Sequence, residues 1–321
     1  MINDTLLRLV PPILRARDFR LYTRDGRRMV DLWQYGGAAI LGHTPAGLLR
    51  SLKNTAERGL FAPLPHPQEN RFLKALSSLF AMGSPESPGL TFRLYRSDTA
   101  LCHALISGGC FVPVDTPFPD PAIPLASKTS TPTPAEPPSP IGSTPLLWRP
   151  FMDMALPNDR PLIPVLPLPW PDAPRVLALP QAPASALPVD LPPGQEPALS
   201  RGRESAAFPP SEIISPLALT AATRSVYDLI AATPARGRVR YPRIEAALTK
   251  STWRRQGIYL YCDADDKAYT DIFKQFLEQG FLIPPTQGLP LILPGVLSAG
   301  EETKLAACLR TISKGVFYGK Q

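Results

Sequence analysis

Proline is concentrated in the middle of this chain of 321 residues. Of its 42 prolines, 27 lie in the 98 positions from 113 to 210. Proline lacks a backbone N–H and its ring clashes with a preceding helical turn, so long helices are excluded there and central strands are disfavoured. We expect residues 112–210 to cover an ordered body as irregular chain, with short apolar stretches at 162–166 and 175–179 as edge or isolated strands.

The segments on either side of this middle predict regular structure. Alternating apolar and polar residues at 18–22 and 28–32, separated by Asp25-Gly26, are typical of a two-stranded ribbon with a tight turn. Apolar spacing predicts a helix that opens at Thr44-Pro45, further helices at 67–80, 97–105, 216–234, 268–279 and 299–313, and strands at 90–95, 258–261, 281–283 and 289–293. This alternation is typical of an α/β fold with a layered C-terminal domain.

The net charge of +7 is unevenly distributed. Residues 1–100 hold 14 Lys/Arg and 8 Asp/Glu, residues 101–210 hold 6 and 9, and residues 211–321 hold 14 and 10. The densest basic stretch, residues 236–243, suits either phosphate binding or a solvated loop between helices. No nucleic-acid recognition motif accompanies it, so we expect no nucleic-acid partner.

Metal, secretion and membrane signals are missing from the sequence. The first thirty residues carry arginines where a secretory signal needs an apolar core. The longest uncharged run, residues 281–300, contains four prolines and is unsuited to a spanning helix. No CxxC or Cys/His ligand spacing involves the cysteines, which are Cys102, Cys110, Cys262 and Cys308. We expect a reduced, cytoplasmic protein without a metal site or a membrane partner.

Several motifs, in their order along the chain, resemble those of class III aminotransferases, the fold type I group of pyridoxal-phosphate enzymes. The ribbon at 21–31, followed by Leu41-Gly-His43 and Pro45, is similar to the family's opening hairpin and its LGH motif. Residues 97–104 stand where the family has SGTEANEA. Similar motifs follow at 215–222, 253–260, 278–283 and 291–296. The resemblance covers residues 15–105 and 211–312.

The resemblance implies a remnant of the pyridoxal-phosphate-dependent transferase fold, shortened and degenerate. Residues 1–105 would form an N-terminal hairpin with helices and a phosphate-cup-like segment. Residues 106–210 would be a proline-rich remnant of the large domain, and residues 211–321 an aminotransferase-like small domain. A complete family member is longer by roughly a hundred residues, and the missing part falls in the domain that carries the cofactor.

Cofactor chemistry of this kind needs a Schiff-base lysine and a carboxylate beside the pyridine nitrogen. Lys128 is the sole lysine between Lys74 and Lys250, so it is the candidate for the lysine. It follows the phosphate segment too closely for the family's spacing, and an ordinary solvated lysine is the alternative. The strand expected at 175–179 is followed by Pro180-Gln181 rather than an acid, while Asp172 precedes it.

The resemblance makes Ser97, Asp98 and Thr99 candidates for binding the cofactor phosphate at a helix start. Asp98 stands where the family has glycine, and its carboxylate would lie beside the dianion. The alternative is a capped helix start without a ligand. Leu291 replaces the family's substrate-binding arginine. Because the sequence places no acid near His43 or His66, we expect a turn or packing role for His43.

Three functional hypotheses follow. The first is a degenerate, non-catalytic aminotransferase-like protein with a binding or regulatory role and no cofactor. The second is a pyridoxal-phosphate-dependent aminotransferase that uses Lys128. The third is an interaction scaffold whose PxxP segments, at 160–164 and 164–167, are ligands for a partner. The resemblance implies a homodimer or a heteromer with a full-length relative, and it leaves a small-molecule ligand open.

Overall fold

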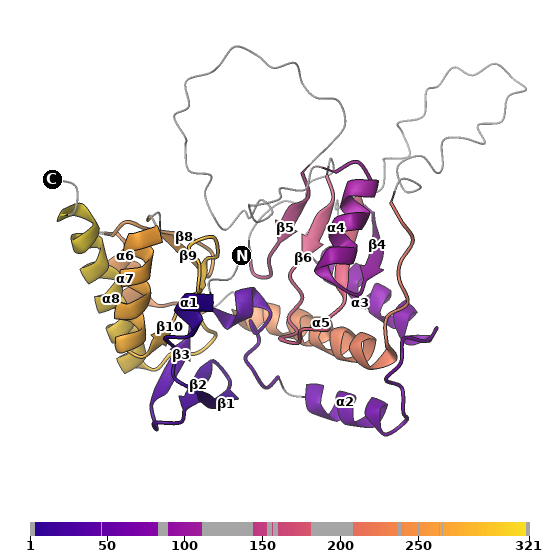
Figure 1. Cartoon of the computed structure of the whole chain (residues 1–321), viewed down its shortest axis with the longest axis horizontal. Helices are drawn as coiled ribbons and strands as arrows, with labels where there is room; N and C mark the ends of the chain where they lie inside the picture. The colour runs from indigo at the N-terminus through magenta and orange to yellow at the C-terminus, as the bar shows by residue number, and fades with distance from the viewer. Residues whose placement is uncertain are drawn as a thin grey trace, which may run out of the picture.

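The structure is a computed structural model that describes residues 4–45, 47–82, 89–110, 144–152, 156, 160–180, 208–236, 239–249, 251–262, 264 and 266–318. Side chains in the last helix are described as far as Arg310. Lys128 lies outside the described residues, as do all of 112–143 and 181–207, so the expectation of irregular chain there stays a prediction. Two groups of helices and sheets lie side by side (Figure 1).

The first group combines the two ends of the chain. Its four-stranded sheet has the order β1 (Ile13–Arg17), β2 (Arg20–Thr23), β3 (Arg28–Asp31) and β10 (Phe281–Leu282). The β2–β3 ribbon predicted from Asp25-Gly26 is confirmed, with Gly26 at a φ of 81°. β3 pairs in parallel with β10, so two segments more than two hundred residues apart in sequence form one sheet.

A second sheet of this group has the order β11 (Leu291–Ile292), β9 (Tyr259–Cys262) and β8 (Trp253–Gln256). The helices of the group are α6 (Pro242–Leu248), α7 (Asp266–Glu278) and α8 (Ala299–Tyr318), with α8 packed against both α6 and α7. The spacing of apolar residues predicted α7 and α8. It did not predict the short α6, which starts with Pro242 at its first position.

The other group surrounds a sheet in the order β4 (Leu90–Tyr95), β7 (Arg175–Pro180), β6 (Leu162–Pro164) and β5 (Leu146–Trp148). The long helix α5 (Pro216–Arg236) packs against α2 (Leu48–Ala56) and α3 (Gln68–Ala81), and α4 (Asp98–Ser107) packs against β7 and β4. Strand 90–95 and helix 67–80 were predicted within one residue. Short helical segments α1 (Asp4–Leu7) and η1 (Gln34–Gly37) complete the elements of the described chain.

The expectation of edge or isolated strands at 162–166 and 175–179 is wrong. β6 and β7 occupy the two interior positions of their sheet, and Leu162, Val176, Leu177 and Ala178 are buried. The prolines do not prevent this arrangement because Pro164 and Pro180 are the last residues of their strands. Part of the proline-rich middle therefore forms sheet rather than irregular covering chain.

The start of α2 also differs from the sequence prediction. The helix begins at Leu48, not at Thr44-Pro45, because Gly47 has a left-handed φ of 86° and ends the preceding turn. A Cβ at Gly47 would lie 2.8 Å from Cζ of Arg224 on α5, so glycine permits the close approach of these two segments.

Candidate functional site

The N-terminus of α4 contains the three candidate phosphate-binding residues. β4 ends at Tyr95, and Ser97 then takes an extended conformation as the N-cap. Its Oγ accepts a hydrogen bond from the amide of Ala100 at 3.1 Å. The hydroxyl predicted for cofactor phosphate is therefore bonded to the first turn of its own helix, as in an ordinary cap. Thr99 is exposed on the same turn.

Asp98 forms an ion pair with Arg175. Its carboxylate accepts two hydrogen bonds from Arg175, from Nε at 2.6 Å and from Nη2 at 3.0 Å. The pairing of β4 with β7 brings Arg175 opposite Tyr95, which places the guanidinium at the start of α4. The expectation that this carboxylate would face an anion did not anticipate Arg175, because the two residues are 77 positions apart.

A second carboxylate, that of Glu212, binds the residue just before the N-cap of α4. Oε2 of Glu212 accepts from the amide of Arg96 at 2.7 Å, and Oε1 of Glu212 lies 3.5 Å from Nη2 of Arg96. The segment containing Glu212 follows the outer side of β4, where the amide of Leu94 donates to Oγ of Ser211 at 3.1 Å. At the start of α4, the two carboxylates are therefore each paired with an arginine, and Oγ of Ser97 is bonded within the helix.

Other parts of a pyridoxal-phosphate site are missing near α4 among the described residues. The lysines whose side chains are described all lie on exposed faces of helices, at Lys53, Lys74, Lys267, Lys274 and Lys304. Asp172 lies in an exposed turn before β7, and Leu291 is buried in β11 opposite Leu260. The thiol of Cys102 on α4 has its pKa raised, first by burial and then by the charge of Asp98.

A polar cluster that the sequence did not predict lies after β3. Oδ2 of the buried Asp31 is 2.8 Å from Nε2 of His43, while Oδ1 accepts from the amides of Trp33 and Gln34. The side-chain amide of Gln34 donates to the carbonyl of Ile292 at 3.0 Å. His43 thus has an acidic partner twelve positions earlier, which corrects the expectation that no acid lies near it.

The adjoining loop has left-handed backbone and is contacted by a buried arginine that follows β5. Gln34, Tyr35 and Gly36 have φ values of 48°, 50° and 69°. Nη1 of Arg149, which is 1% exposed, donates to the carbonyl of Gly36 at 2.7 Å. The same guanidinium lies 5.5 Å from the ring centre of Tyr259 on β9. This loop therefore joins β3 to the sheet formed by β11 and β9.

Arg236 is the least expected residue of the structure. It was assigned to a basic stretch suited to a solvated loop, but it is 7% exposed at the end of α5. Nη2 donates to the carbonyl of Leu293, and the rings of Phe19 and Phe151 lie 5.8 and 5.7 Å from Cζ. Burial lowers the pKa of Arg236 to about 10. The guanidinium therefore stays charged at neutral pH and fixes α5 to the C-terminal sheet.

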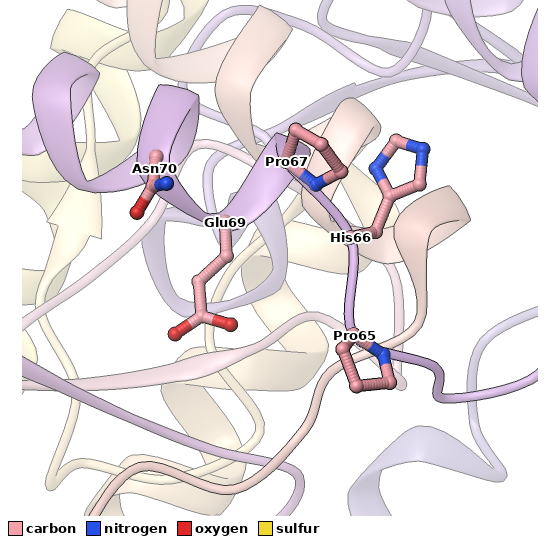
Figure 2. A pocket seen from close by; sticks show the side chains of 5 residues that line it. All are labelled: Pro65, His66, Pro67, Glu69 and Asn70. Atoms are coloured by element: carbon pink, nitrogen blue, oxygen red, sulfur yellow. The ribbon is translucent and has the colours of Figure 1, made fainter.

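The surface depression beside α3 does not contain a catalytic pair. It is lined by Pro65, His66, Pro67, Glu69 and Asn70. Figure 2 shows the His66 ring and the Glu69 carboxylate pointing away from each other. Nδ1 of His66 accepts from the amide of Gln68 at 3.1 Å. Within the described residues, no three His, Cys, Asp or Glu side chains are grouped to hold a metal ion.

Comparisons with known structures settle the fold. An ornithine δ-aminotransferase from Plasmodium falciparum matches over 95% of this chain and 93% of its own, with a TM-score of 0.59 and 10% identity. An acetylornithine aminotransferase from Elizabethkingia anophelis matches over 95% and 94%, with a TM-score of 0.55 and 12% identity. The chain has the class III aminotransferase fold. The likeness extends through the middle of the chain, beyond the two segments in which sequence motifs resemble the family.

The sequence relatives do not assign an activity. No family model matches the chain. An uncharacterized protein from Treponema pallidum is 26% identical over 298 residues, which are 90% of this chain and 91% of the relative. One from Borreliella burgdorferi is 40% identical over 80 residues, 25% of this chain and 30% of the relative. Among the described residues, no helix is both long and apolar enough to cross a membrane.

Proposed function

We propose that this protein is a non-catalytic chain of the aminotransferase fold with a binding or regulatory role. The observation that carries the proposal is the start of α4. Ser97 caps its own helix there, and Asp98 is held by Arg175 in the place where the fold would bind a cofactor phosphate. The described residues at the start of α4 therefore do not fit the phosphate group of pyridoxal phosphate.

Electrostatics and hydrogen bonding support this proposal independently. The carboxylates of Asp98 and Glu212 both lie at the α4 start, where they occupy Arg175 and Arg96, the two cations that would otherwise attract a phosphate dianion. A helix start favours anions through its free amides and its dipole. Here the amides of Arg96 and Ala100 already donate to side chains of the protein. The local chemistry stabilises the helix rather than a ligand.

The test is the visible spectrum of the purified chain during titration with pyridoxal phosphate, together with a transaminase assay. We expect no saturable chromophore and no amino transfer from ornithine, acetylornithine or alanine. The matched variant is Lys128→Ala, compared with Lys74→Ala, which removes an exposed lysine of α3. A chromophore and an activity that are lost in Lys128→Ala and kept in Lys74→Ala would refute the proposal and establish the enzyme alternative.

We propose further that the chain self-associates or pairs with a second chain of this fold. Three large apolar side chains on α2 and in the segment between α2 and α3 are exposed, namely Leu49 at 78%, Phe61 at 59% and Leu64 at 57%. Exposed apolar groups of this size are typical of interaction surfaces. Light scattering after size exclusion should give a mass above 35 kDa. The mass should fall in Leu49→Ser/Phe61→Ser, whereas a wild-type monomer over a tenfold concentration range would contradict association.

A further inference from the structure

The outer edge of β1 is an uncovered strand edge. In the described chain β1 lies at one end of its sheet, with β2 on one side and no strand on the other. Figure 1 shows the β1–β2 hairpin at the lower margin of the molecule. In an antiparallel sheet, alternate residues of an end strand direct N–H and C=O away from the neighbouring strand. β1 therefore offers backbone donors and acceptors to an added strand.

The side chains of β1 are unusually exposed for a strand. Ile13, Leu14, Arg15 and Arg17 are all exposed, with Leu14 at 71%. Proteins protect sheet edges from unwanted pairing with charges, prolines or bulges, and they avoid exposed apolar residues there. The two arginines fit such protection. The register shift between Ile13 and Arg15 fits it as well. The exposed Ile13 and Leu14 do not, so the edge has apolar groups that a partner could bury.

The charge around this edge selects the kind of partner. Residues 8–28 contain seven arginines and two aspartates, a net charge of +5 within a chain of net charge +7. In the described part of the chain, no carboxylate forms an ion pair with Arg8, Arg15 or Arg24, and Arg15 instead lies 4.4 Å above the ring of Tyr22. Arg17 is 3.9 Å from Asp18, and both side chains are more than 60% exposed. Such exposed cations attract an acidic partner.

We propose that β1 binds an extended acidic segment of another protein by strand addition, with acidic residues facing Arg15 and Arg17 and apolar residues facing Leu14. Antiparallel pairing of β1 with a second copy of β1 would bring like charges together, which is unfavourable. A nucleic acid would leave Ile13 and Leu14 unburied, and a lipid surface would not use the backbone edge. The proposal does not depend on whether the chain binds pyridoxal phosphate.

The experiment measures fluorescence anisotropy of a labelled peptide with the sequence Glu-Val-Glu-Val-Glu-Val-Glu added to the full chain. Three control peptides are used. One replaces every glutamate with lysine, and the other two carry N-methyl groups on alternate residues, one peptide for each phase of the alternation. We expect the acidic peptide to bind, and the lysine peptide and one of the N-methylated peptides to bind at least about tenfold more weakly. Added salt should weaken binding of the acidic peptide.

The matched protein variants are Arg15→Glu/Arg17→Glu and Arg50→Glu/Arg71→Glu, which change the net charge equally on β1 and on the exposed faces of α2 and α3. Peptide affinity should fall at least about tenfold in the first variant and less than about threefold in the second, provided both melt like the wild type. Absence of binding at about 1 mM peptide, or equal losses in both variants, would overturn the proposal. Binding of phosphatidylserine vesicles or oligo-dT that is lost in the β1 variant, without peptide binding, would also overturn it.

Discussion

The starts of α4 and α8 use the same three kinds of residue in different surroundings. At α8, Ser298 and Glu301 cap each other: the Glu301 amide donates to Oγ of Ser298, and the Ser298 amide donates to Glu301. Arg20 then donates to both oxygens of Glu301, at 3.0 and 2.7 Å. At α4, Ser97 caps the helix, and Arg175 holds Asp98 with the same two-pronged geometry.

Exposure separates the two sites. The side chains of Arg20 and Glu301 are 16% and 11% exposed, whereas those of Arg175 and Asp98 are 29% and 76% exposed. No sequence motif at the start of α8 resembles a cofactor site. The α8 start nevertheless has the same kinds of residue as the α4 start, namely a capping serine and an acid bound by an arginine. A serine, an acid and an arginine at a helix start are therefore sufficient to stabilise the helix without a phosphate.

The largest effect is expected at α8. Glu301→Ala leaves Arg20 partly buried without its carboxylate and removes half of the capping box, so the free energy of unfolding should fall by about 2 kcal/mol. Urea unfolding followed by circular dichroism measures this change. Glu278→Ala, on the exposed end of α7, is the control and should change stability by less than about 0.5 kcal/mol. Equal effects of the two variants would show that the α8 network is not stabilising.

The same pair should give the protein a pH-dependent stability. Burial raises the pKa of Glu301, but hydrogen bonds from Arg20 and Ser298 outweigh it, and the net pKa lies below its ordinary value. The stabilisation is therefore complete above the ordinary pKa of about 4.3 and is lost as the pH falls through the lower, folded-state pKa. The stability difference between wild type and Glu301→Gln should shrink between pH 5 and pH 3. A constant difference over this range would contradict the assignment.

A smaller loss is expected from the α4 cap. Ser97→Ala removes the acceptor for the Ala100 amide and should lower the free energy of unfolding by about 1 kcal/mol. Ser97→Asp keeps an acceptor at the N-cap and should restore most of that stability. Thermal melting of the three proteins measures both changes. If Ser97→Ala were neutral, the hydroxyl would be free for another purpose and the comparison with α8 would fail.

The smallest effect is expected for the exposed ion pair. Asp98→Ala should cost about 0.5 kcal/mol or less, since an exposed pair is screened by water and salt. Arg175→Ala should cost about 0.5 kcal/mol more than Asp98→Ala, because Arg175 also donates to the carbonyl of Ala173. Melting curves at low and high salt measure the contribution of the ion pair, because salt screens the ion pair but not side-chain packing. A loss above about 2 kcal/mol from Asp98→Ala would mean that the site is far less solvated than its exposure indicates.

The fold was predictable wherever local patterns were decisive. The Asp25-Gly26 turn, the apolar face of α3 and the strand before Ser97 each specify their element within a few residues. The interior position of β6 and β7 was not predictable from proline density, because only the position of Pro164 and Pro180 at strand ends makes proline compatible with the sheet.

The helix start at Ser97, Asp98 and Thr99 was predictable from the sequence, but the ion pairs around it were not. The sequence motif located Ser97, Asp98 and Thr99 at a helix start, and the structure places them there. Arg175 on β7, the partner of Asp98, and Glu212, the partner of the neighbouring Arg96, each lie more than seventy positions away. Such long-range pairs depend on strand order, so neither Arg175 with Asp98 nor Gln34 with Ile292 has a local sequence signal.

The central claim, that the α4 start is a cap rather than a cofactor site, is tested most directly by covalent trapping. The purified chain is incubated with pyridoxal phosphate, reduced with borohydride and analysed by intact mass and peptide mapping. We expect substoichiometric labelling spread over exposed helical lysines such as Lys53 and Lys74, with no increase in Ser97→Asp. A single stoichiometric adduct at Lys128 that is lost in Ser97→Asp would contradict it.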